Sequence, residues 1–209
     1  MNEHNILGAI LAGGQSKRMG TDKLFLEINN KKLIEYTIDK VKKYLKDLII
    51  LTDSNNEFFS KNNLITVKDC VEGQLGPLVG ILTAMKWAKE NLKKCSWVAT
   101  FPCDTPFFPE IIINNFIKES KKKDSLILSA SSHGRRHNIF GLWSLDLYDK
   151  LKDDLINKKI RKVQDWTKKN KIKNLEFKFE DYDPFFNINT QEDLKHAEKL
   201  IKRIANENK

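Results

Sequence analysis

The chain has 209 residues, of which 40% are hydrophobic and 31% are charged. This composition predicts a soluble globular protein of one domain and excludes disordered, collagen-like and disulfide-stapled classes. The 37 Lys and Arg residues outnumber the 28 Asp and Glu residues, and the net charge of +9 favours anionic partners. Because the excess is lysine scattered in short runs, solvated helix faces explain it better than a nucleic-acid surface.

The spacing of the cysteines and the length of the apolar runs indicate the cellular compartment of the protein. The three cysteines contain no Cys-x-x-Cys pair, so neither a zinc knuckle nor a disulfide framework is indicated. The N-terminus has no basic region followed by a long apolar stretch, and no apolar run approaches the roughly 20 residues that span a bilayer. We therefore expect a cytoplasmic protein that binds neither membrane nor nucleic acid.

The first half of the chain alternates short apolar runs with helical patterns. Residues 6–11 are a short apolar run that ends at glycines, which predicts a strand buried on both faces. Apolar residues then recur at helical spacing over 33–45, with lysines between them on the expected solvent-exposed face. Further strands are predicted at 48–52, 64–67 and 97–101, with helices over 81–92 and from Pro109 onward.

The second half is less regular. Strands are predicted at 126–130 and 139–143, an alternating segment at 175–179, and helices at 145–155 and 161–167. A last helix is expected after Thr190, whose hydroxyl can cap it while Asp193 lies three residues on. Strands that alternate with helices predict an α/β fold, Rossmann-like and three-layered, with a mostly parallel central sheet.

The segment LAGGQSKRMGTDK, residues 11–23, follows the first predicted strand, where parallel sheets tend to bind ligands. Its glycines let backbone N–H groups approach an anion. Ser16 adds a hydroxyl donor, and Arg18 and Lys23 add cations. Together they predict a triphosphate cradle, although a glycine-rich turn with unrelated basic residues is the alternative. Neither Walker A nor Gly-x-Gly-x-x-Gly spacing occurs, so those two nucleotide-binding classes lose support.

This segment resembles the signature of the nucleotidyltransferases that activate sugars and cofactors, in the form seen in molybdenum cofactor guanylyltransferases. Later blocks resemble that family in the same order and cover nearly the whole chain: GPLVGI at 76–81, PCDTPF at 102–107, FGLW at 140–143 and NINTQEDL at 187–194. The resemblance implies a nucleotidyltransferase fold in one domain, residues 1–209. It places the nucleotide in about residues 1–110 and the acceptor in about 111–209.

Asp104 is expected at the carboxyl end of a strand, in the crevice that holds the phosphates. Mg²⁺ commonly binds one or two protein carboxylates together with phosphate oxygens and water, so Asp104 suits a metal ligand. An aspartate that stabilises a Thr-Pro turn is the alternative. By resemblance, the catalytic residues are Arg18, Lys23 and Asp104.

The nucleotide site implied by the resemblance extends to later loops. Asp69 resembles the family aspartate associated with the nucleotide, and the glycines of 73–80 permit backbone approach to the base. Asp53 stands near the end of the second strand, where the family often has asparagine, and a loop-entry aspartate is an equal alternative. The implied nucleotide-binding residues are Leu11, Ala12, Gly13, Gly14, Ser16, Lys23, Asp53, Asp69, Gly76 and Asp104.

Two segments are candidates for the acceptor site. Asn187 and Asn189 are two apart in an extended segment and should face the same side, although turn and capping chemistry is the alternative. Arg135 and His137 lie in a basic segment that could bind the acceptor phosphate. Asn138 follows where the family often shows proline, and a solvated loop is an equally good interpretation.

The resemblance implies transfer of GMP from GTP to molybdenum-bound molybdopterin, with Mg²⁺ as cofactor and pyrophosphate as the second product. Molybdopterin-loading proteins and acceptor molybdoenzymes are the further partners it implies. Alternatives of the same fold use CTP on molybdopterin or a nucleoside triphosphate on a sugar phosphate. An alternative of another class is a non-catalytic, nucleotide-regulated binding protein.

Overall fold

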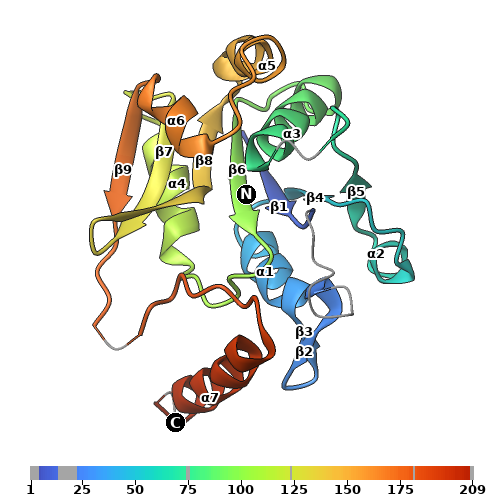
Figure 1. Cartoon of the computed structure of the whole chain (residues 1–209), viewed down its shortest axis with the longest axis vertical. Helices are drawn as coiled ribbons and strands as arrows, with labels where there is room; N and C mark the ends of the chain where they lie inside the picture. Colours follow the sequence, from blue (N-terminus) through green and yellow to red (C-terminus); the bar gives the residue numbers. More distant parts are fainter. Residues whose placement is uncertain (1–4, 14–22, 74–75, 123, 181, 208–209) are drawn as a thin grey trace.

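The computed structural model describes residues 5–13, 23–73, 76–122, 124–180 and 182–207. A seven-stranded sheet in the order β5-β4-β1-β6-β8-β7-β9 lies at its centre (Figure 1). The strands are β1 (Ile6–Leu11), β4 (Asp47–Leu51), β5 (Ile65–Val67), β6 (Trp97–Pro102), β7 (Ile127–Ser132), β8 (Arg135–Ser144) and β9 (Ile172–Glu176). β8 runs antiparallel to β6 and β7, and the other neighbours pair in parallel. The predicted mostly parallel sheet is confirmed.

Helices cover both faces of this sheet (Figure 1). Helices α1 (Leu33–Lys42) and α4 (Ile111–Ser120) pack on one face, and α3 (Pro77–Asn91), α5 (Tyr148–Ile156) and α6 (Val163–Lys168) pack on the other. Strand β1 is apolar throughout because its alternate side chains enter the two cores. At Gly8 a β-carbon would lie 2.8 Å from the Val41 side chain, so glycine permits the close approach of α1. The three-layer architecture is confirmed.

A small substructure lies past the carboxyl end of β6 (Figure 1). It consists of the hairpin of β2 (Glu27–Ile28) and β3 (Lys31–Lys32) and the last helix α7 (Gln191–Glu207), joined by the apolar residues Ile28, Leu33, Phe107, Ile188, Ala197 and Leu200. Asn29 and Asn30 turn the hairpin with φ of 50° and 58°, as a tight two-residue turn requires. This hairpin was not predicted, because two asparagines between short polar strands give a weak pattern.

Several predicted boundaries were wrong. Helix α1 ends at Lys42 rather than at residue 45, and the alternating segment at 175–179 overlaps only the end of β9, which spans Ile172–Glu176. The predicted helix at 145–155 is the 3₁₀ turn η3 (Leu145–Leu147) followed by α5. The short helix α2 (Glu57–Lys61) was missed, although Asn56 caps it by accepting a bond from the Phe58 N–H.

The lysines of α1 were all predicted to be solvated, and this is wrong for Lys40. Its ammonium donates hydrogen bonds of 2.7 Å to the carbonyl oxygens of Pro106 and Phe108. Lys42 on the same helix is exposed, as expected. Helical spacing cannot distinguish the two, because the groups that bind Lys40 come from a loop more than sixty residues later. Within the part of the chain that the structure describes, no helix has both the length and the apolar character needed to cross a membrane.

Candidate active site

The loops that follow β1, β4 and β6 are held together at the carboxyl edge of the sheet. The Ala12 N–H donates to the Leu51 carbonyl at 2.9 Å, and the Cys103 N–H donates to the Leu11 carbonyl at 3.3 Å. Because strand-like pairing continues past the strand ends, this edge holds its loop backbones at defined positions. Gly13 is exposed here, while the predicted residues Gly14, Ser16 and Arg18 lie outside the described residues.

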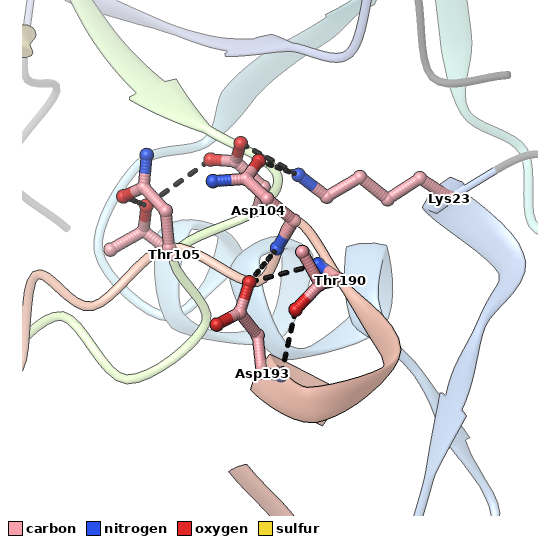
Figure 2. A network of polar contacts seen from close by, with 7 residues as sticks. Lys23, Asp104, Thr105, Thr190 and Asp193 are labelled. Atoms are coloured by element: carbon pink, nitrogen blue, oxygen red, sulfur yellow. Dashed lines mark hydrogen bonds and ion pairs between the residues drawn. The ribbon is translucent and has the colours of Figure 1, made fainter. Parts of the chain in front are cut away.

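Lys23 joins three segments that are far apart in the sequence (Figure 2). It begins the 3₁₀ turn η2 (Lys23–Phe25), and its Nζ lies 2.9 Å from Asp104 Oδ2 and 2.7 Å from Asn189 Oδ1. The Lys23 side chain is only 12% exposed and that of Asp104 only 23% exposed, so this ion pair is shielded from bulk water. An ammonium, a carboxylate and an amide therefore meet just beyond the end of β6.

Thr105 connects the same site to the other predicted asparagine. Its hydroxyl lies 2.8 Å from Asn187 Oδ1 and 3.2 Å from Asp104 Oδ1, and its single proton can be donated to one of them at a time. The N–H of buried Ile188 donates to the Asp104 backbone carbonyl at 2.8 Å. The structure thus brings Asn187 and Asn189 near Asp104, Asn187 through Thr105 and Asn189 through Lys23. Thr105 was not predicted as a site residue, although its position next to Asp104 in the sequence could have indicated it.

The start of α7 fixes the backbone of the asparagine segment (Figure 2). The Asp193 carboxylate accepts 2.8 Å bonds from the N–H groups of Asn189 and Thr190. The Thr190 hydroxyl accepts a 3.1 Å bond from the Asp193 N–H, which completes the predicted capping arrangement. The N–H of Asn189, followed by that of Thr190, keeps the pKa of Asp193 below its usual range. The charged cap therefore holds Asn189 in place at neutral pH.

Asp53, Asp69 and Gly76 lie on the β4–β5 side of the site. Desolvation, and next the negative charge of Asp53, raise the pKa of Asp69, while the Thr83 hydroxyl at 3.5 Å from Asp69 Oδ1 opposes this shift. Thr83 also accepts a 3.0 Å bond from the Cys70 N–H, which ties the Asp69 segment to α3. Gly76 precedes α3 with φ of 73°, a conformation that favours glycine.

The predicted basic segment is a β-hairpin rather than an open loop. His133 and Gly134 turn from β7 into β8 with φ of 48° and 73°, and Arg135 is exposed at the first position of β8. His137 stacks on Phe185 with ring centroids 3.6 Å apart, and its Nε2 lies 2.8 Å from the Ser132 hydroxyl. Burial lowers the pKa of His137 from 6.5 to about 4. His137 is therefore neutral at pH 7, and the positive charge of this segment comes from its arginines.

Comparisons with known proteins agree with this geometry. A family model described as the MobA-like NTP transferase domain matches residues 8–172. A molybdenum cofactor guanylyltransferase from Mesorhizobium japonicum is 35% identical over 205 residues, which cover 96% of this chain and 98% of the relative. The chain belongs to the MobA-like NTP transferase family.

Solved structures support the same fold for this MobA-like NTP transferase. Molybdopterin-guanine dinucleotide biosynthesis protein A from Archaeoglobus fulgidus has a TM-score of 0.73 at 23% identity, covering 94% of this chain and 98% of that one. A CMP:2-keto-3-deoxy-manno-octonic acid synthetase complexed with CTP has the same TM-score at 9% identity, covering 95% and 98%. Backbone similarity therefore establishes the nucleotidyltransferase fold but does not select the base.

Proposed function

We propose that the protein transfers GMP from GTP to molybdenum-bound molybdopterin and releases pyrophosphate. The observation that carries the proposal is the junction of Lys23, Asp104 and Asn189 at the end of β6. It places a cation, a carboxylate and an amide where parallel sheets bind nucleotides. The names of the MobA-like relatives support guanine and molybdopterin as the substrates.

The reaction needs little covalent chemistry from the protein. A phosphate oxygen of the acceptor attacks the α-phosphorus of GTP in line, the bond from that phosphorus to the bridging oxygen breaks, and pyrophosphate leaves. Because the acceptor phosphate already carries its nucleophilic oxygen, catalysis consists of positioning and charge stabilisation. Lys23 binds the transferring phosphate or the departing pyrophosphate, and Arg18 and the glycine-rich loop contribute further positive charge and N–H donors.

The residues present fit a magnesium ion that is completed by phosphate oxygens. The described residues contain no cluster of three or more His, Cys, Asp or Glu side chains that could hold a metal alone. Mg²⁺ does not need one, since one or two carboxylates with substrate phosphates and water suffice. Asp104 would hold the ion, and the Asn189 amide oxygen, 2.7 Å from Lys23 Nζ, would stay with the ammonium beside it. When bound, Mg²⁺ neutralises negative charge on the phosphates.

Asp104 and Lys23 are paired with each other in the present arrangement. Asp104 gives Lys23 a partner at 2.9 Å, so neither charge is left unpaired within a shielded site. Binding of metal-bound triphosphate offers new partners to both side chains. We infer that Lys23 exchanges the carboxylate for phosphate oxygens when GTP binds, while Asn189 keeps its amide oxygen within reach of the ammonium.

The acceptor side supplies contacts of a different kind. Arg135 is exposed at the hairpin and available for a phosphate, whereas neutral His137 offers a ring nitrogen and a stacked aromatic surface. Asn187 and Asn189 can donate amide N–H groups to the acceptor phosphate. We propose that these four residues bind molybdopterin, and that molybdopterin-loading proteins and molybdoenzymes are the protein partners before and after the transfer.

On the nucleotide side, we propose that Leu11, Ala12, Gly13, Gly14 and Ser16 approach the triphosphate and that Asp53, Asp69 and Gly76 lie by the nucleoside. Asp69 can accept hydrogen bonds from a base that presents N–H groups on its edge. Guanine presents an adjacent ring N–H and amino group, whereas cytosine presents one amino group. This difference supports GTP as the better substrate.

The proposal is tested with each of the four nucleoside triphosphates, Mg²⁺ and molybdenum-loaded molybdopterin, with the products identified by mass. We expect the guanine dinucleotide and one pyrophosphate for each GTP consumed. GTP should exceed CTP in kcat/KM by more than about tenfold, which needs only about 1.4 kcal/mol of transition-state discrimination. Equal use of GTP and CTP would contradict the guanine assignment, and the absence of any dinucleotide would contradict the transferase.

A further inference from the structure

Lys40, in the last turn of α1, binds the loop that carries Asp104. Its Nζ donates hydrogen bonds of 2.7 Å to both the Pro106 and the Phe108 carbonyl oxygens. The same ammonium lies 4.8 Å from the centre of the Phe108 ring. Three interactions from one side chain therefore meet within four residues of Asp104, on a segment that has no regular secondary structure between β6 and α4.

The Lys40 ammonium is partly buried and has lost much of its hydration. Burial lowers the pKa of Lys40 to about 8, with nearby Lys31 adding to the shift and Glu110 opposing it. Lys43 and Tyr44 each donate a 2.7 Å bond to Glu110, which anchors the far end of the same loop to the residues directly after α1. A largely buried lysine is costly unless hydrogen bonds compensate it, and the two carbonyl oxygens supply that compensation here.

Two separate segments of the chain hold the loop. Helix α1 binds the Pro106 and Phe108 carbonyls through Lys40. The segment before α7 binds the Asp104 carbonyl through the Ile188 N–H at 2.8 Å. Because rigid catalytic geometry depends on such supporting contacts, release of one side changes where the Asp104 carboxylate lies.

We propose that Lys40 is a positioning residue that fixes the Asp104 loop for the transfer reaction. It touches neither substrate nor metal and acts only through the backbone of residues 106–108. The inference rests on the proposed transferase function, in which Asp104 holds the metal with the phosphates. Loss of Lys40 should therefore lower the rate of the chemical step and weaken the response to Mg²⁺, while GTP binding through the other loops is largely retained.

Lys40→Met tests this, because methionine fills a similar volume and donates no hydrogen bond. We expect kcat to fall by about tenfold to a hundredfold, the KM for GTP to change by less than about threefold, and the Mg²⁺ concentration for half-maximal rate to rise. Lys40→Arg should recover most of the rate, since a guanidinium can donate to two carbonyls. Lys42→Met, at an exposed position of the same helix, is the matched control and should behave as the unaltered protein.

A second measurement does not depend on turnover. Hydrogen exchange by mass spectrometry should show faster exchange over residues 103–110 in Lys40→Met than in Lys42→Met, with the β1 and β6 peptides unchanged. If Lys40→Met does not fold, Lys40→Leu, which likewise donates no hydrogen bond, replaces it with the same measurements. A folded variant with the original kcat, Mg²⁺ dependence and loop exchange would overturn the proposal, as would a lowered Tm alone. Failure of the unaltered protein to form any dinucleotide would instead refute the transferase function, and loop exchange would still decide whether Lys40 holds the loop.

Discussion

The two halves of the central sheet differ in the side chains that they bring to the candidate site. On the β5-β4-β1-β6 side, the strands are parallel and their loops carry charged groups, among them Lys23, Asp69 and Asp104. On the β8-β7-β9 side, the antiparallel hairpin carries the neutral His137 stacked on Phe185. The shielded ion pair therefore lies at the junction with the first half, whereas the second half combines the exposed Arg135 with a neutral stacked ring.

The largest effect should come from the carboxylate at the junction. Asp104→Ala should lower kcat by at least about a hundredfold, because the group that holds the metal beside the developing charge is lost. Steady-state kinetics at several Mg²⁺ concentrations measures this, and circular dichroism should show an unchanged fold.

Asp149→Ala is the matched control for Asp104. Asp149 is 87% exposed and makes one ion pair of 3.9 Å with Lys89, so its loss should be silent. Near-normal turnover of Asp104→Ala would show that Asp104 is not a metal ligand and that other residues stabilise the developing charge.

A somewhat smaller effect is expected at Lys23. If its ammonium contacts phosphate oxygens, the interaction strengthens as charge develops, so Lys23→Ala should lower kcat by about tenfold or more and also raise the KM for GTP. Lys23→Arg should rescue poorly, because the planar guanidinium cannot occupy the place of an ammonium between Asp104 and Asn189.

Lys122→Ala serves as the control for a surface cation. Lys122 is 47% exposed and pairs with Glu119 one helical turn away, so its removal should leave the kinetics unchanged. A Lys23→Ala enzyme with intact kcat and only a raised KM would make Lys23 a binding residue rather than a catalytic one.

The smallest effect concerns the neutral histidine of the second half. Because the pKa of His137 falls from 6.5 to about 4 on folding, the unfolded chain binds the extra proton between these values. Its contribution to stability is therefore fully present above pH 6.5 and is lost as the pH falls toward 4. Urea unfolding midpoints across this range should decline less steeply for His137→Phe, which retains the stacking on Phe185. Parallel pH dependence in the two proteins would contradict a buried, neutral His137.

Much of the fold could be predicted from the sequence because its signals are local. The apolar run of β1 lies between two helical layers, and the cap at Thr190 and Asp193 lies within four residues. The β2–β3 hairpin could not be predicted in the same way, since its turn depends on two asparagines with positive φ and its stability depends on packing against α7.

The candidate site could be predicted only in part, for a similar reason. Asp104, Lys23 and the two asparagines have signals in short motifs, and the structure brings them together. The depressed pKa of His137 and the burial of Lys40 depend on partners distant in the sequence: Phe185 stacks on His137, and residues 106–108 bind Lys40. A sequence pattern shows a residue type and its spacing, whereas charge state depends on three-dimensional surroundings.

We propose that Lys23 links the asparagine segment of the second half to the phosphate site of the first. A double-mutant cycle on kcat/KM with Lys23→Ala, Asn189→Ala and the combined variant tests this link, using GTP and molybdenum-loaded molybdopterin. Because Nζ and the amide oxygen lie 2.7 Å apart, we predict a coupling energy of at least about 0.5 kcal/mol. The double variant should then lose less activity than the sum of the two single losses. Strictly additive losses would show that the two halves act on the reaction independently and that Lys23 does not link them.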